Sequence, residues 1–165
     1  MILMIMIEFF GLVRFVVLSV LTLLAYVLSS GSLYKIGVNN NVKYPWLAFV
    51  PIAHYYIIGS ICEEYRLRGV TIKQLGIVMP LLLLAQVSLS AVSSFLAFVP
   101  GIIIGIVVTL IMHKFFYLFD PTKAFILAII CLFGHLATAL TLFYIKDMRI
   151  QMSSGAYPYP FGESR

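Results

Sequence analysis

The feature that most constrains the fold is the stretch 75–119, in which two apolar blocks are separated only by Val99, Pro100 and Gly101. The first block, residues 75–98, has no ionisable side chain, and a helix of this length covers the roughly 30 Å of hydrocarbon in a bilayer. The second block, residues 101–119, begins the return. This stretch therefore predicts two membrane-spanning helices joined by a tight turn at Pro100.

The composition extends this interpretation to the whole chain. Of the 165 residues, 62% are hydrophobic and only 10% are charged, whereas about a quarter are charged in a soluble domain. We predict a single membrane domain over residues 1–145, followed by a polar and aromatic tail over 146–165. The net charge of +5 is typical of loops that face anionic lipid and does not indicate nucleic-acid binding.

Residues 2–28 are interpreted as the first membrane-spanning helix. Arg14, the apolar run after it and the small residues 29–32 imitate a secretory signal, but the stretch before Arg14 is apolar rather than basic. Residues 124–145 form the last predicted span, because Asp120 and Pro121 before them are suited to a helix start. Thr71 and Gln74 have the spacing of a capping box before the span 75–98.

Residues 45–68 predict one further helix that is re-entrant or interfacial, with an apolar first half, a charged second half and Gly69 as a cap. If this helix does not cross, one side of the membrane carries seven basic residues and the other carries three. If it crosses, they divide five to five, which removes any orientation signal. We therefore expect an all-α, polytopic bundle of four spans with both termini outside, and five spans is the alternative. The seven are Lys35, Lys43, Arg66, Arg68, Lys73, Lys114 and Lys123; the three are Lys146, Arg149 and Arg165.

Small residues predict where the two helices of 75–119 pack. Gly101 and Gly105 have the GxxxG spacing that allows close approach in a membrane, although glycine is also simply common in membrane helices. The predicted packing residues are Ser90, Ser94, Ala97, Gly101 and Gly105.

Two groups of polar residues are candidate sites. Arg14, Gln86, Thr109 and His135 fall at similar depths in the predicted spans and could form one intramembrane layer. The alternative is purely structural: Gln86 bonds His135, and Arg14 extends to the outer interface. A second, cytoplasmic group could bind a divalent metal, but it has no recognised metal-site spacing, and Glu64 could instead pair with Arg68 on a helix. This second group is His54, Glu63, Glu64 and His113.

Two segments carry a resemblance to known proteins. They are Tyr44-Pro45-Trp46-Leu47-Ala48-Phe49-Val50-Pro51-Ile52-Ala53, followed by Tyr55-Tyr56, and Leu118-Phe119-Asp120-Pro121-Thr122-Lys123-Ala124. The chain resembles uncharacterised small multispanning membrane proteins of Gram-positive bacteria that carry "WLAFIPIA"-like and "LFDPxxA"-like segments. The resemblance implies a bacterial cytoplasmic membrane and no particular activity. His54 stands where an Asn or Gln is expected.

Three functions are compatible with these patterns. The first is a non-enzymatic membrane subunit that packs against another membrane protein or forms a homo-oligomer. The second is a small transporter or channel component that uses the polar layer, and the third is an interfacial membrane enzyme. The sequence contains no known catalytic motif, which favours a non-enzymatic role but leaves enzyme activity open, and we expect no catalytic residue, no cofactor and no bound metal. Cys62 and Cys131 are interpreted as free thiols.

Overall fold

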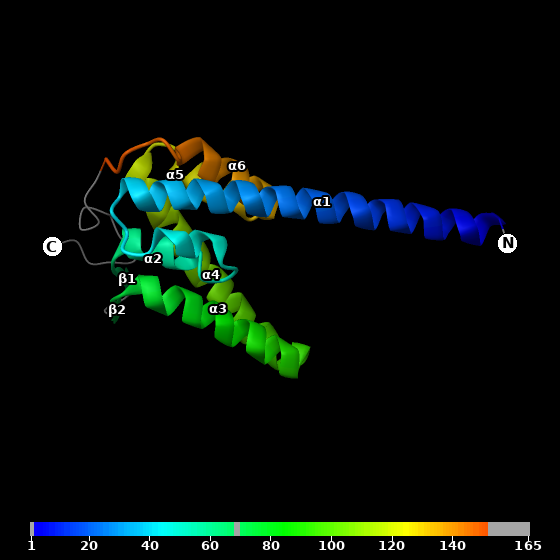
Figure 1. The fold of residues 1–165 in the computed structure, drawn as a ribbon. Helices are drawn as coiled ribbons and strands as arrows, with labels where there is room; N and C mark the ends of the chain where they lie inside the picture. The colour runs from blue at the N-terminus through cyan, green and yellow to red at the C-terminus, as the bar shows by residue number, and fades with distance from the viewer. Residues whose placement is uncertain (1, 68–69, 152–165) are drawn as a thin grey trace.

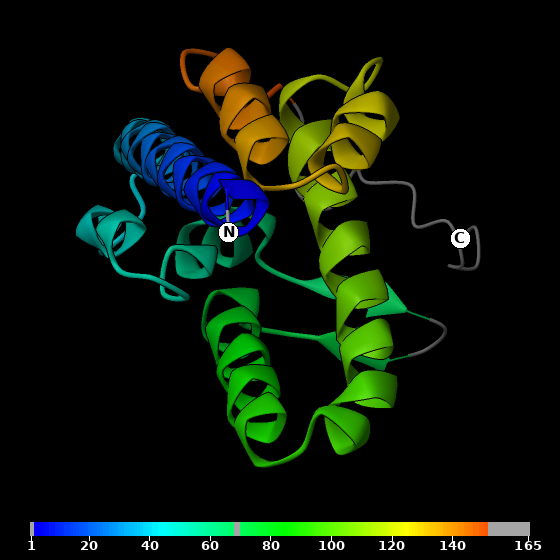
Figure 2. The same ribbon diagram turned by 90° about the vertical axis from the view of Figure 1, so that its right-hand side faces the viewer.

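The structure, a computed structural model, describes residues 2–67 and 70–151, and it describes no side chains for residues 2–9, 66, 67, 70, 94 and 96. The tail 152–165 and the predicted cap at Gly69 lie outside the described residues. Over the described residues the chain is a helical bundle with one two-stranded hairpin (Figures 1 and 2). Three of its helices are long and apolar enough to cross a membrane, so the predicted all-helical, membrane-type class is confirmed.

The first helix, α1 (Ile2–Asn39), is much longer than predicted. Its 38 residues correspond to about 57 Å, and Figure 1 shows its N-terminal half extending well past the other elements. The predicted end at residue 28 is wrong because the small residues that follow continue the helix. The hydroxyl groups of Ser29 and Ser32 donate to the helix's own carbonyl oxygens, at Tyr26 and Leu28.

The turn between the two central helices lies earlier than predicted. Helix α3 (Leu75–Val92) ends at Ser93, whose backbone is extended, and α4 (Ser94–Phe119) begins directly after it. The predicted turn at Pro100 is wrong, since Pro100 lies inside α4. A proline inside a membrane helix is tolerated when neighbouring groups satisfy the freed carbonyl. Serine side chains compete for backbone hydrogen bonds, which explains why the helix breaks at Ser93, in the serine-rich stretch, instead of at Pro100.

The single helix predicted over 45–68 is wrong. The chain forms a short 3-10 helix, η1 (Pro45–Phe49), then a turn, then α2 (Tyr55–Cys62). Proline at position 51 disfavours a helical conformation for the residue before it, and Ile52 has a positive φ of 68°. Helix α2 stops at Glu63, which has a φ of 57°, so Glu64 lies outside the helix.

Strands β1 (Tyr65–Leu67) and β2 (Val70–Ile72) form an antiparallel hairpin that pairs Tyr65 with Ile72. The predicted capping box is also wrong: Thr71 lies in β2, and Gln74 caps α3 in a left-handed conformation without a side-chain hydrogen bond. Threonine, valine and isoleucine favour strands, which outweighs the capping pattern here.

The last predicted span, 124–145, does not form one helix. Helix α5 (Ala124–Cys131) ends after eight residues, Gly134 takes a φ of 116°, and α6 (His135–Ile145) turns back alongside α5. Lys123 Nζ lies 2.8 Å from the hydroxyl of Tyr144, so the start of α5 is close to the end of α6. The segment therefore returns to the end of the molecule from which it started.

Most chain turns gather at one end of the molecule, which we call the hairpin end. It contains the end of α1, the β1–β2 hairpin, the start of α3, the end of α4 and both outer ends of α5 and α6 (Figures 1 and 2). Gln151 N donates to Leu118 O over 2.9 Å, and Lys35 forms an ion pair with Asp147. The described chain thus starts beyond the opposite, far end and finishes at the hairpin end. The C-terminus itself lies outside the described residues, so the expectation that both termini lie on one side of the membrane stays a prediction.

The segment Pro45–Cys62 follows a similar path. The hydroxyl of Tyr26, well inside α1, donates to Phe49 O over 2.7 Å, whereas Cys62 leads directly into the hairpin. This segment and Ala124–Ile145 both start at the hairpin end, reach the middle of the molecule and return. We call them the first and second inward segments.

Helices α2 and α3 approach each other closely at two glycines. A Cβ atom on Gly59 would collide with the carbonyl group of Leu75, and one on Gly76 would collide with Ser60 Oγ. The hydrophobic core lies beside this contact, and Phe115, Phe116 and Phe119 of α4 are fully buried in it. The first inward segment is therefore fixed tightly to α3 at the hairpin end.

Candidate functional site

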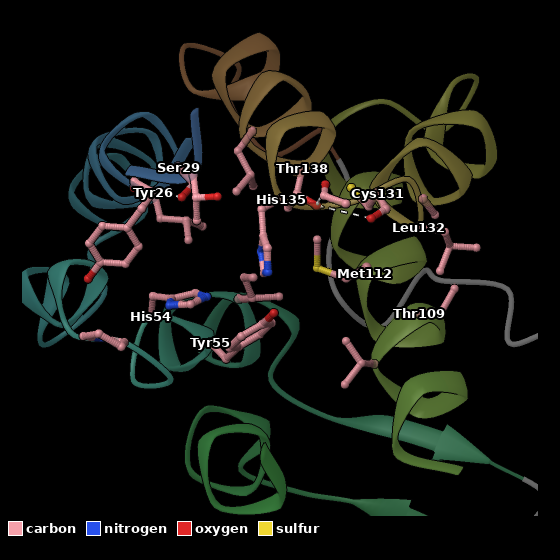
Figure 3. Close-up of a pocket in the computed structure, with 18 residues that line it drawn as sticks. Tyr26, Ser29, His54, Tyr55, Thr109, Met112, Cys131, Leu132, His135 and Thr138 are labelled. Carbon is pink, nitrogen blue, oxygen red and sulfur yellow. Dashed lines mark hydrogen bonds between the residues drawn. The ribbon is translucent and has the colours of Figure 1, made fainter. Parts of the chain in front are cut away.

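The inner tips of the two inward segments meet around a cavity of about 400 Å³. Helices α1 and α4 complete its wall, so residues from five elements surround it (Figure 3). The residues that carry polar side-chain atoms at the cavity are Thr22, Tyr26, Ser29, His54, Tyr55, Thr109, Cys131, His135 and Thr138.

The cavity lies part-way along α1 and α4, at similar distances from their hairpin ends. At a rise of 1.5 Å per residue, Thr109 is about 15 Å along α4 from Phe119, and Tyr26 is about 20 Å along α1 from Asn39. His135 is about 15 Å along α6 from Ile145. These distances match half the thickness of a hydrocarbon core of about 30 Å.

Most hydroxyl groups at the cavity donate to carbonyl oxygens of the protein. Tyr26 donates to Phe49, Ser29 to Tyr26 and Thr109 to Gly105. Thr138 Oγ1 lies 3.1 Å from Gly134 O and 3.3 Å from Cys131 O. Because a hydroxyl oxygen keeps two lone pairs after donating, these groups can still accept hydrogen bonds from a ligand.

Two imidazoles lie on facing sides of the cavity, His54 from the first inward segment and His135 from the start of α6 (Figure 3). The Nδ1 atom of His54 is buried without a hydrogen-bond partner, and its ring lies 4.3 Å from that of Tyr55. A neutral imidazole carries one donor and one acceptor. The pair can therefore offer both kinds of hydrogen bond to a molecule between them.

The thiol of Cys131 completes the polar wall at the end of α5. Its Sγ lies 3.2 Å from Thr141 Oγ1, where either atom can donate. Thr141 in turn donates to Thr138 O over 2.8 Å. These contacts join the end of α5 to α6 and hold the turn at Gly134 in place.

Apart from Arg14, the described charged side chains lie at the hairpin end, outside the cavity. The Thr122 hydroxyl donates to Asp120 Oδ1 over 2.6 Å and lowers the pKa of that carboxyl below its ordinary value of 3.8. A hydrogen bond from Lys35 likewise lowers the pKa of Asp147. Both carboxylates fix chain turns beside the bundle: Asp120 between α4 and α5, and Asp147 against the end of α1.

The predicted polar layer is divided by the structure. Thr109 and His135 line the cavity, but Gln86 lies between α3 and α4, where its Nε2 donates to Ala97 O over 3.1 Å. Arg14 is exposed on the protruding half of α1. The four residues therefore do not surround one cavity, because Gln86 and Arg14 lie away from the one that Thr109 and His135 line.

Three of the predicted packing residues lie beside Gln86 and do not line the cavity. Ser90, Ala97 and Gly101 line a shallow hollow with Gln86, and a Cβ on Gly101 would come within 2.8 Å of Gln86 Nε2. Gly105 faces open space, and the side chain of Ser94 lies outside the described ones. Helices α3 and α4 thus meet at Gly101 through the Gln86 amide.

The predicted cytoplasmic group is also divided. His54 lines the cavity, whereas Glu63 and Glu64 line a separate open hollow with Lys73 at the hairpin end. His113 packs its ring 6.2 Å from that of Phe125. No group of three or more His, Cys, Asp or Glu within residues 2–67 and 70–151 is placed to hold a metal ion.

Sequence reasoning missed six of the polar cavity residues: Thr22, Tyr26, Ser29, Tyr55, Cys131 and Thr138. Each looks like an ordinary residue of an apolar helix. The available signals were Pro51 and Gly134, because both break helices in otherwise apolar stretches and so mark the two tips.

Comparison with known proteins adds no family to this picture. The chain matches no protein-family model, and comparison with curated proteins and with solved structures gives no match either.

Proposed function

We propose that the protein is a multi-pass membrane protein that binds a small uncharged solute in the cavity between its two inward segments, as a transporter or channel component. The observation that carries the proposal is the position of the two tips, each of which places irregular backbone part-way along α1 and α4, about 15–20 Å from the hairpin ends of these helices. At that depth in a membrane, non-helical backbone is tolerated only where it is buried in protein or lines a water-filled cavity.

The proposed membrane arrangement has three spans, formed by α1, α3 and α4, with both inward segments re-entrant. It supersedes the expectation of four. Large apolar side chains cover the outer faces of the bundle: Phe125 is 67% exposed, and Ile103 and Leu81 are also exposed. Soluble monomers rarely leave such continuous apolar surface in water, which supports lipid contact. The resemblance implies a bacterial cytoplasmic membrane as the location.

The chemistry of the wall supports an uncharged solute. No Asp, Glu, Lys or Arg is among the residues that line the cavity. A buried ion without a counter-charge is costly, whereas neutral hydrogen-bonding groups are well matched by imidazole and hydroxyl side chains.

The test is extraction of the protein from its native membrane into lipid nanodiscs, followed by mass spectrometry of the molecules that remain bound. We expect an uncharged small molecule with the wild type and its loss from His135→Leu. The matched control is Gln86→Leu, which removes a polar group of similar depth from the other hollow and should retain the molecule. A wild-type protein without any such molecule, or equal retention by both variants, would contradict the proposal.

A second candidate function is that of a subunit which packs against another membrane protein. The observation that favours it is the protruding half of α1, where Phe15 is 72% exposed and Leu12 and Leu23 are 63% exposed. In the nanodisc experiment this function predicts a stoichiometric protein partner, or a homo-oligomer, that is lost when the N-terminal half of α1 is replaced by a polar helix.

A further inference from the structure

We infer that the cavity opens to the extracytoplasmic side of the membrane and that the hairpin end faces the cytoplasm. This inference rests on the membrane arrangement of the proposed function, but not on the identity of any solute. It is drawn from two independent observations: the direction in which the cavity is open, and the distribution of basic side chains.

The exposure of the cavity wall changes in the same direction on every element that forms it. On α1, Thr22 is exposed, whereas Leu33, nearer the hairpin end, is buried. On α6, His135 is exposed and Leu142 is buried. In the first inward segment, Pro51 is exposed and Ile58 is buried. On α4 and α5 the wall residues nearer the hairpin end, Met112 and Ala128, are buried, whereas Thr109 and Cys131 are partly exposed. The mouth of the cavity therefore faces away from the hairpin end.

The floor of the cavity is a tightly packed core. Between the cavity and the hairpin end, Phe115 and Phe119 of α4 are fully buried, with ring centroids 5.2 Å apart. Lys114 beside them is also fully buried and donates to Glu64 O. Among the described residues, such packing closes the hairpin side of the cavity. In this conformation a molecule enters the cavity from the side opposite the hairpin end.

The basic side chains identify the two sides. Arg14 is the one Lys or Arg among the described side chains that lies away from the hairpin end. Lysine and arginine near the ends of membrane spans are concentrated on the cytoplasmic side, where anionic lipid headgroups attract them. The described basic residues at the hairpin end are Lys35, Lys43, Lys73, Lys114, Lys123, Lys146 and Arg149.

Exposed aromatic residues also indicate that a membrane interface lies at the hairpin end. Tyr44 and Trp46 at the start of the first inward segment are exposed, and so is Tyr144 at the end of the second. Lys43 lies 5.3 Å from the ring centroid of Tyr44, and Lys123 bonds the hydroxyl of Tyr144. Tyrosine and tryptophan next to lysine are typical of the headgroup region.

The inference is tested by cysteine labelling in intact cells with a membrane-impermeant, positively charged methanethiosulfonate reagent. The background is the variant in which Cys62 and Cys131 are both replaced by serine. Single cysteines are placed at the cavity mouth (Thr22→Cys and His135→Cys), at the hairpin end (Lys73→Cys and Thr122→Cys) and on the outer apolar face (Ile126→Cys). Variants are compared only when each elutes as one species in size-exclusion chromatography, and two positions per region protect against the failure of one.

We expect labelling of the cavity-mouth cysteines in intact cells, labelling of the hairpin-end cysteines only after permeabilisation, and no labelling of Ile126→Cys in either case. The reverse pattern, with the hairpin end labelled in intact cells, would overturn the inference and leave the proposed function standing. Strong labelling of Ile126→Cys in membranes would overturn the membrane arrangement itself. If neither cavity-mouth cysteine were labelled in intact cells while the hairpin-end cysteines still required permeabilisation, the inferred access to the cavity from the extracytoplasmic side would be overturned.

Discussion

The hairpin end and the far end of this molecule are built in opposite ways. At the hairpin end, all six described α-helices contribute residues to a core that includes Phe115, Phe116 and Phe119, and a strand pair and an ion pair lie beside it. At the far end, α3 and α4 are joined by the turn at Ser93 and meet through the Gln86 amide, and the described side chains of α1 from Phe10 to Leu24 are exposed. Stability is therefore concentrated at the hairpin end, whereas the open cavity and the exposed N-terminal half of α1 lie toward the far end.

The largest expected effect is at the buried core. Phe116→Ala should lower the free energy of unfolding by about 4 kcal/mol, because it removes a fully buried ring and leaves a cavity. The matched control at the far end is Phe98→Ala, where the ring is 67% exposed and the change should stay within about 0.5 kcal/mol. Thermal or denaturant unfolding in lipid nanodiscs measures both. Equal destabilisation would show that the two ends do not differ.

The contact between α2 and α3 gives the next effect. Gly59→Ala should cost about 2–3 kcal/mol, because its Cβ would meet the Leu75 carbonyl rather than a flexible side chain. Gly105→Ala is the control: it has no neighbour within 4 Å and should be neutral or slightly stabilising, by up to about 1 kcal/mol. The same unfolding measurement applies. A harmless Gly59→Ala would mean that the first inward segment is not fixed to α3 as described.

A smaller effect is expected between α3 and α4. Gln86→Leu removes the hydrogen bond to Ala97 O and should cost about 0.5–1 kcal/mol, the usual value for a hydrogen bond between membrane helices. Ser88→Ala is the control, since its hydroxyl bonds only its own helix at Leu84 O and should change stability less. If Gln86→Leu were as damaging as Phe116→Ala, the far end would be as firmly packed as the hairpin end.

The smallest effect concerns Asp120 and its pH dependence. Hydrogen bonding from Thr122 holds the folded-state pKa of Asp120 below its ordinary value of 3.8. The stabilisation is therefore complete above about pH 4 and is lost as the pH falls through the lower folded-state pKa. Thr122→Val should raise the pKa of Asp120 and reduce the loss of stability on acidification. NMR titration of Asp120 measures the shift, and Thr71→Val is the control, expected to leave it unchanged.

Sequence patterns were most reliable where length and hydropathy decide the structure. Residues 75–92 and 101–119 were expected to be helical and apolar, and they are. The patterns were least reliable at breaks. Pro100 looked like a turn and lies inside α4, whereas Gly134 was not seen as a break and reverses the chain. A break depends on which carbonyl and N–H groups find partners elsewhere, and no local pattern records those partners.

The candidate site shows the same division. His54, Thr109 and His135 were identified one by one because polar residues in apolar stretches are unusual. Their grouping was not predicted: His54 was assigned to the cytoplasmic group and His135 to a layer with Gln86. Only the return of the chain at Gly134 brings His135 to face His54.

The sequence by itself determined that the chain is apolar, helical and able to cross a membrane, because these properties depend on composition and on the length of uninterrupted apolar stretches. The tertiary structure alone decided that residues 124–145 turn back, that the described basic side chains other than Arg14 collect at one end, and that two tips enclose a cavity. The physical reason is that an apolar side chain is equally stable against lipid and against protein. The pattern of apolar residues therefore predicts burial, but it does not specify the direction in which a helix runs or the partner that covers it.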